Sequence, residues 1–181
     1  MRPIARVGAV NYLNTKPLIE GLTDFDSSIE LSLDLPSRLA IQMEEKELDV
    51  GLIPVIEFFR AGTYSLLPGI SIASRGPVLS VTLFSKLPWK QIRSVSLDEG
   101  SRTSAALTKI LFKKRYDVEA SFEPLSIDTA AENVQTDAVL LIGDRAMRAC
   151  LPGFAHAYDL GHEWTSWTGL PMVFAVWAVR E

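Results

Sequence analysis

The sequence predicts an α/β protein built from two successive α/β series, and three observations support this. Short apolar runs of strand length alternate with segments of helical periodicity, most of which begin near a capping side chain or a proline. This alternation occurs twice, and the segment between the two series, residues 66–84, has strand-like runs broken by proline and glycine. Hydrophobic residues make up 48% of the 181 residues, which supplies enough apolar surface for a core.

The first series reads as strand, helix, strand, helix, strand. Its predicted strands are residues 4–10, 29–35 and 49–56. Asn14 and Pro17 favour a helix start after the first strand, and Pro36 favours one after the second. Alternating strands and helices imply parallel pairing with right-handed crossovers. We therefore predict a first α/β lobe over residues 1–75.

The second series follows the crossing segment. Its predicted strands are residues 94–97, 120–125 and 138–142, and its predicted helices are residues 102–115, 130–134 and 145–150. A last apolar strand, residues 173–179, ends almost at the final residue. We assign it to a second lobe over residues 76–181, which leaves no chain to return and complete the first lobe.

Charge and cysteine content narrow the class of partner. The net charge is −4 and the lysines and arginines are scattered, so the sequence shows no electrostatic footprint for nucleic acid or an anionic membrane. The longest apolar run, residues 172–179, is too short to cross a bilayer. Cys150 is the single cysteine, and no signal-sequence pattern follows Met1. We predict a cytoplasmic protein with a small-molecule partner and an unspecified oligomeric state.

The turn after the first strand is the first candidate site. Ligands of open α/β sheets collect at the carboxyl ends of strands, where helix N-termini present free N–H groups. Here Tyr12, Asn14 and Thr15 bring a phenol, an amide and a hydroxyl into one connection. The amide of Asn14 can both donate and accept, which suits a substrate hydroxyl or carboxylate. Capping of a helix by Asn14 or Thr15 explains the same residues equally well.

A glycine turn before residues 101–104 is the second candidate site. Its hydroxyl-bearing members are Ser101, Thr103 and Ser104, and Arg102 adds a guanidinium. Backbone N–H groups, the helix dipole and the fork of Arg102 together match a carboxylate or phosphate. The alternative is one serine cap beside a solvated arginine. Capping needs one hydroxyl rather than three, so we favour an anion site.

Two further positions complete the candidates. Gly143 follows a buried strand and permits close approach of a ligand to the backbone, although a tight turn with Asp144 as helix N-cap is the favoured explanation of this pair. Ser80 lies in the crossing segment, either facing an interlobe cleft or as a serine on an edge strand.

Metal and cofactor chemistry have no motif in this sequence. His156, His162 and Cys150 offer no zinc spacing, and neither a nucleophile elbow nor a dinucleotide glycine fingerprint is present. We therefore predict no metal and no cofactor.

Several segments, taken in order, resemble the chorismate dehydratase family of the futalosine route to menaquinone biosynthesis. They are residues 6–18, 76–80, 101–104, 141–144, 159–164 and 167–178. Each is weak alone, but their order is specific and spans essentially the whole chain. The resemblance implies a lyase that converts chorismate to 3-[(1-carboxyvinyl)oxy]benzoate and water without a redox cofactor. It also implies a type II periplasmic-binding-protein-like fold, in which two lobes close over a ligand cleft and exclude water. Family members continue past the last strand and re-enter the first lobe, so by resemblance the first lobe is incomplete.

The resemblance also implies residue roles. Asn14 matches an active-site asparagine, Ser80 matches a cleft serine, and residues 101–104 suit a carboxylate. Our hypothesis is that Arg102 and the helix N-terminus anchor one carboxylate of chorismate while Asn14 orients the ring. No turn supplies a well-placed base, so the enolpyruvyl carboxylate of the substrate is the hypothetical proton acceptor.

Two other functions stay open at this point. A non-catalytic small-anion-binding or sensor protein is possible because the same fold often only binds its ligand. The related naphthoate synthase of the same pathway ranks lower, because its opening motif differs from residues 11–14.

Overall fold

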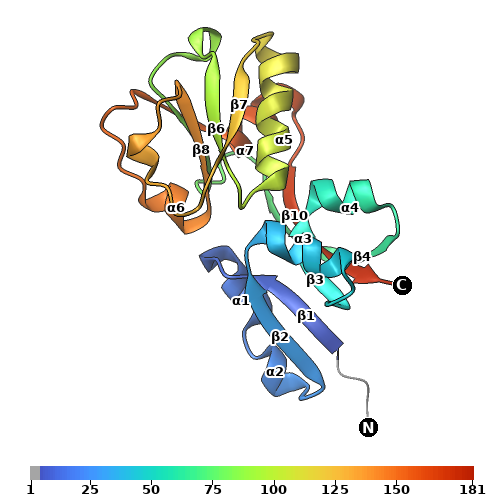
Figure 1. The fold of residues 1–181 in the computed structure, drawn as a ribbon. Coiled ribbons are helices and arrows are strands. Elements are labelled where there is room, and N and C mark those ends of the chain that lie inside the picture. The colour runs from blue at the N-terminus through green and yellow to red at the C-terminus, as the bar shows by residue number, and fades with distance from the viewer. Residues whose placement is uncertain (1–4) are drawn as a thin grey trace. The chain divides into compact units, whose positions relative to one another are not determined.

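The computed structural model describes residues 5–181 and divides the chain into two compact units (Figure 1). The first unit comprises the chain up to Ile72 together with Val173–Glu181, and the second comprises Ala73–Met172. Ile4, the first residue of the first predicted strand, lies outside the described residues.

The first unit is a five-stranded sheet with helices connecting its strands. Its strands are β1 (Ala5–Val10), β2 (Ile29–Asp34), β3 (Val50–Pro54), β4 (Tyr64–Ser74) and β10 (Met172–Arg180), in the order β2-β1-β3-β10-β4. Its helices are a 3-10 helix (Leu13–Thr15), α1 (Lys16–Ile19), α2 (Leu22–Phe25), α3 (Pro36–Glu44) and α4 (Val55–Ala61). Strand β1 pairs in parallel with β2 and β3, as the alternating pattern predicts.

The core of this unit lies between its sheet and α3. Leu39 and Met43 on α3 are fully buried, as are Leu52 and Ile53 on β3. Gly8 permits this contact, because a Cβ atom there would lie 2.3 Å from a methyl carbon of Leu48 and 2.7 Å from one of Leu39. A larger residue at position 8 would therefore require the packed side chains of Leu39 and Leu48 to shift.

The second unit has its own five-stranded sheet. Its strands are β5 (Val81–Ser85), β6 (Ser94–Asp98), β7 (Ser121–Leu125), β8 (Ala138–Ile142) and β9 (His156–Asp159), in the order β7-β6-β8-β5-β9. Its helices are α5 (Arg102–Ile110), a π-helix (Leu111–Tyr116) that continues α5, α6 (Gly143–Arg148), α7 (Leu160–Thr168), and 3-10 turns at Trp89–Gln91 and Ala131–Asn133. Strand β6 is parallel to β7 and β8, whereas β5 is antiparallel to β8 and β9.

The last strand belongs to the first unit, which corrects the predicted lobe boundaries. We assigned residues 173–181 to the second lobe, but β10 pairs antiparallel with β3, with Val176 opposite Ile53. The segment Phe174–Ala178 is buried, and its placement between β3 and β4 covers both of its edges. This strand is therefore a return segment for the first unit. The first division between the units falls after Ile72, within β4, rather than at residue 75.

Asp49 ties three strands of the first unit together. Its carboxylate accepts hydrogen bonds from the backbone N–H (3.0 Å), Nε (3.0 Å) and Nη2 (2.7 Å) of Arg6 on β1. It also accepts one from Nη2 of Arg180, at the end of β10, at 2.6 Å. These bonds, chiefly those from Arg6, hold the pKa of Asp49 well below its usual range. Ionised Asp49 therefore stabilises the folded state.

Replacing Asp49 with asparagine is expected to lower the free energy of unfolding at pH 7 by roughly 1–2 kcal/mol, because the ion pairs with Arg6 and Arg180 are lost. The effect is limited to this size because the side chains are partly exposed and solvent screens their charges. The pKa of this carboxyl is lower in the folded state than in the unfolded state. Its contribution to the free energy of unfolding is therefore complete above the unfolded-state pKa of about 4, and it is lost as the pH falls through the folded-state pKa. The difference between wild type and Asp49→Asn in urea denaturation should shrink below about pH 4. Asp24→Asn, on the exposed surface of α2, is the control; a pH-independent difference would contradict the role of the charge.

Candidate functional site

The strand order of the second unit brings several predicted site residues to one end of the sheet, where β6 and β8 finish. Strands β6 and β8 are parallel neighbours, so the start of α5 and the turn at Gly143 follow carboxyl ends at the same edge. Ser80 immediately precedes β5, where Val81 pairs with Ile142, and this register places Ser80 beside Gly143. The backbone N–H of Gly143 donates to the carbonyl oxygen of Ser80 at 2.7 Å.

The hydroxyls at the start of α5 are buried, and one of them caps the helix. Ser101 is the N-cap, and its Oγ accepts a hydrogen bond from the backbone N–H of Ser104 at 3.2 Å. Thr103 and Ser104 are at most 5% exposed, and Arg102 is half-buried. A hydroxyl that accepts one hydrogen bond still has its own proton to donate, so capping does not remove Ser101 from an anion site.

A buried ion pair lies at this edge that the sequence interpretation did not single out. Asp98 ends β6 and is 2% exposed, and its Oδ1 accepts a hydrogen bond from the backbone N–H of Gly100 at 2.9 Å. Its Oδ2 lies 3.6 Å from Nη1 of Arg145 on α6, whose guanidinium also donates to the carbonyl of Thr129. Burial raises the pKa of Asp98, against the opposing effects of Gly100 and Arg145. An aspartate at the end of a buried strand was the available signal.

The turn at Gly143 differs in part from its predicted form. Gly143 has a φ of 60°, which favours glycine, so the predicted tight turn is present. The predicted capping by Asp144 is wrong, because Ile142 is the N-cap and makes no side-chain cap bond. Asp144 is the second residue of α6, where a carboxylate interacts favourably with the helix dipole.

The remaining predicted residues lie in the first unit. Asn14 is exposed within the 3-10 helix, and Tyr12 is half-buried against the core of that unit. Thr15 is the N-cap of α1 but forms no side-chain cap bond, and its Oγ1 is buried without a hydrogen-bond partner in residues 5–181. The capping explanation for Asn14 and Thr15 is therefore not what the structure shows, and the exposed amide of Asn14 is accessible to a ligand.

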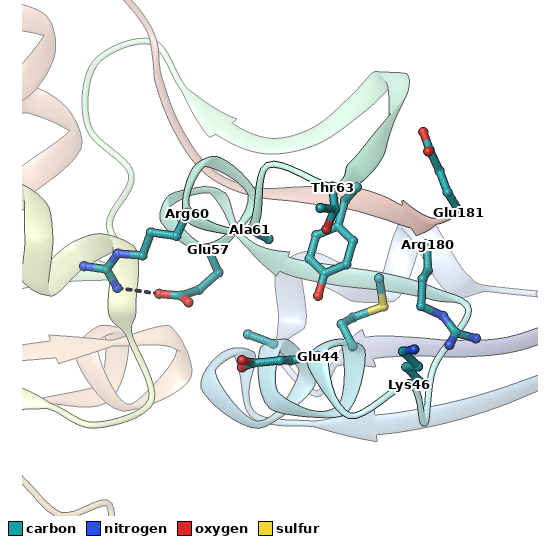
Figure 2. A pocket seen from close by; sticks show the side chains of 11 residues that line it. Glu44, Lys46, Glu57, Arg60, Ala61, Thr63, Arg180 and Glu181 are labelled. Atoms are coloured by element: carbon teal, nitrogen blue, oxygen red, sulfur yellow. Dashed lines mark hydrogen bonds and ion pairs between the residues drawn. The ribbon is translucent and has the colours of Figure 1, made fainter.

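A pocket of about 550 Å³ in the first unit contains none of the predicted site residues (Figure 2). It is lined by Ala40, Met43, Glu44, Lys46, Glu57, Arg60, Ala61, Thr63, Tyr64, Arg180 and Glu181. Figure 2 shows the ion pair between Glu57 and Arg60, whose closest atoms are 2.6 Å apart. Acidic and basic side chains balance in this lining, so the pocket has no evident preference for an anionic ligand.

Two kinds of feature are absent from residues 5–181. No helix there is long and apolar enough to cross a membrane. No group of three or more histidine, cysteine, aspartate or glutamate side chains in the same range converges in a way that would hold a metal ion.

Comparison with known proteins identifies similar sequences and folds. Residues 5–181 match the model of a family described as menaquinone biosynthesis. The chorismate dehydratase of Thermus thermophilus is 38% identical over 209 aligned positions, which cover 100% of this chain and 71% of that protein. A solved protein from Archaeoglobus fulgidus matches with a TM-score of 0.72 at 20% identity, over 97% of this chain and 67% of the other.

A protein from Candida albicans, described as having the generic periplasmic binding protein fold, matches with a TM-score of 0.57 at 11% identity. This match covers 98% of the chain and 63% of the other protein. At sequence identities of 20% and 11%, similarity to these two solved structures shows the fold alone. The similarity confirms the predicted periplasmic-binding-protein-like α/β fold.

Proposed function

Because the chain belongs to the menaquinone biosynthesis family, as its motifs predicted, we propose that it is a chorismate dehydratase. The observation that carries this proposal is the 38% identity to the Thermus thermophilus chorismate dehydratase, which extends over the whole chain. The chain spans 71% of the length of that relative.

The proposed reaction converts chorismate to 3-[(1-carboxyvinyl)oxy]benzoate and water. The bond between the ring and its hydroxyl oxygen breaks, and a proton leaves a neighbouring ring carbon. The electrons of that C–H bond complete the aromatic ring, and the hydroxide and the proton leave together as water. No electron acceptor is consumed, so the reaction is a hydro-lyase step driven by aromatisation.

In this proposal the start of α5 anchors one carboxylate of the substrate. The first-turn N–H groups and the positive end of the helix dipole favour an anion, and the guanidinium of Arg102 matches a carboxylate in geometry and charge. The burial of Ser101, Thr103 and Ser104 supports this role, because hydrogen bonds to a carboxylate are stronger where water is excluded.

The other substrate contacts are assigned by chemistry. Ser80 supplies a hydroxyl donor beside Gly143, which has no side chain to separate its backbone from a ligand. The exposed amide of Asn14, with Tyr12 and Thr15 in the same turn, orients the hydroxyl-bearing ring. Asp144, at the start of α6, lies beside Gly143 and is the remaining proposed substrate contact.

The proton acceptor in this proposal is the enolpyruvyl carboxylate of the substrate. Among the described residues, the ring of His156 stacks on Tyr158 with centroids 5.8 Å apart, and His162 is exposed on α7. The carboxylate of Asp98 is buried and interacts with Gly100 and Arg145. A base carried by the substrate is consistent with this arrangement.

Incubation of the purified chain with chorismate tests the proposal. We expect 3-[(1-carboxyvinyl)oxy]benzoate to accumulate as chorismate disappears, without any added cofactor, as followed by chromatography with mass detection. Calorimetric titration of the same sample measures binding separately. Binding without product would contradict the enzymatic proposal and favour a non-catalytic anion-binding protein.

A further inference from the structure

The segment that leads to Ser80, residues 76–80, adopts an unusual backbone conformation. Leu79 has a φ of 63°, in the left-handed region that non-glycine residues rarely adopt. Its side chain is 68% exposed, so no burial of apolar surface compensates for this conformation. Ser80, the next residue, is 9% exposed. Strained backbone persists only where the surroundings enforce it, and such residues concentrate at functional sites.

The carboxylate of Asp159 binds the backbone of this segment. Its Oδ2 accepts hydrogen bonds from the backbone N–H of Val78 at 2.9 Å and from that of Leu79 at 2.7 Å, and its Oδ1 lies 3.0 Å from the same N–H of Val78. Oδ1 also accepts from the backbone N–H of His162 at 2.9 Å, which makes Asp159 the N-cap of α7. One carboxylate thus caps a helix and binds two consecutive amides about 80 residues away in the sequence.

Two further residues of α7, Gly161 and Thr165, also contact this segment. A Cβ atom on Gly161 would lie 2.5 Å from Oγ of Ser74 and 2.7 Å from the carbonyl oxygen of Gly76. The Oγ1 of Thr165 accepts a hydrogen bond from the backbone N–H of Gly76 at 3.0 Å. Residues 76–79 are therefore fixed to α7, whereas the carbonyl of Ser80 is fixed to Gly143.

We propose that Asp159 is a positioning residue for the reaction, which holds residues 76–80 in the strained conformation and thereby places the hydroxyl of Ser80. The catalytic part of this proposal rests on the proposed function and on the role assigned to Ser80. The proposal goes beyond helix capping, because a cap requires one oxygen and the second carboxylate oxygen binds the N–H groups of Val78 and Leu79.

Replacing Asp159 with serine separates the two roles. Serine is as good an N-cap as aspartate, so it retains an acceptor for the N–H of His162. It has a single side-chain oxygen and cannot also bind the two amides of the segment. We expect kcat for chorismate to fall about 10- to 100-fold while KM stays within about threefold, because a misplacement of about 1 Å costs rate on this scale.

Asp137→Ser is the matched control. Asp137 lies in the same unit, and its Oδ2 accepts hydrogen bonds from the backbone N–H groups of Arg93 (2.8 Å) and Ser94 (3.1 Å), at the start of β6. Both variants lose a carboxylate that binds two consecutive amides. We expect both to lower the melting temperature, and only Asp159→Ser to lower kcat. Equal kcat values in the two variants would overturn the positioning role.

Hydrogen–deuterium exchange of the unliganded protein tests the proposal without turnover. The backbone N–H groups of Val78 and Leu79, which Asp159 binds, are expected to exchange at least about tenfold faster in Asp159→Ser than in wild type and in Asp137→Ser. Unchanged exchange there would overturn the proposal. Absence of product from the wild-type protein would instead overturn the proposed function, and with it the catalytic part of this inference, whereas the exchange result would still decide whether Asp159 holds the segment.

Discussion

Replacing Arg102 with alanine is expected to raise the KM for chorismate about 10- to 100-fold, with a smaller effect on kcat. A hydrogen bond between charged groups contributes roughly 1.5–3 kcal/mol, and this contribution is lost when the guanidinium is removed. We propose that Arg102 anchors a carboxylate that is present in both the substrate and the transition state, so the loss should appear mainly in binding. Steady-state kinetics and calorimetric titration with chorismate measure the two quantities separately.

Two further variants show whether the geometry of Arg102 matters. Arg102→Lys keeps the charge but loses the planar fork, so its KM should lie between those of wild type and Arg102→Ala. Arg148→Ala removes an exposed arginine from α6 in the same unit and should leave KM unchanged. Unaltered substrate affinity in Arg102→Ala would remove this residue from the anchoring site.

Replacing Asn14 with alanine is expected to lower kcat about 10²- to 10³-fold. We propose that its amide orients the hydroxyl-bearing ring, and loss of one preorganised donor at a reacting centre costs rate on this scale. Because Asn14 is exposed, its truncation should leave the melting temperature nearly unchanged. Turnover of chorismate and thermal unfolding, measured on the same preparation, separate the catalytic effect from a folding defect.

Asn133→Ala, which removes an exposed amide from the second unit, is the control for this experiment. It should behave as wild type in both measurements. Full turnover by Asn14→Ala would contradict the orienting role of this residue.

Local patterns predicted most of the strands, but the partner of the last one depended on distant residues. The alternation of strands and helices indicated the parallel pairing of β1 with β2 and β3, and the structure has it. The last strand follows the second series and ends almost at the final residue, so we assigned it to the second lobe. Its apolar run is suited to any buried position, and its place in the sheet depends on two distant strands, β3 and β4, between which it lies.

The candidate site shows the same division between local and distant information. Strand ends and helix starts predicted the region around Ser101 and Gly143, because both lie at carboxyl ends of parallel strands. The contacts of Asp159 with Val78 and Leu79 join residues about 80 positions apart, and no local pattern indicates such a pair. The place of Asp98 at the end of a strand could be read locally, but its partner Arg145 is distant in the sequence, so the pair was missed.

The position of β10 also determines the order in which the chain assembles on the ribosome. The strand pairs Val179 with Val50 and Ala175 with Pro54, so the sheet of the first unit joins segments that are synthesised more than 120 residues apart. Domains generally fold in the order of their synthesis, but β3 must wait for its neighbour until the whole second unit has been translated. The second unit, which is continuous in sequence, is therefore free to fold first and to bring the two ends of the discontinuous unit together.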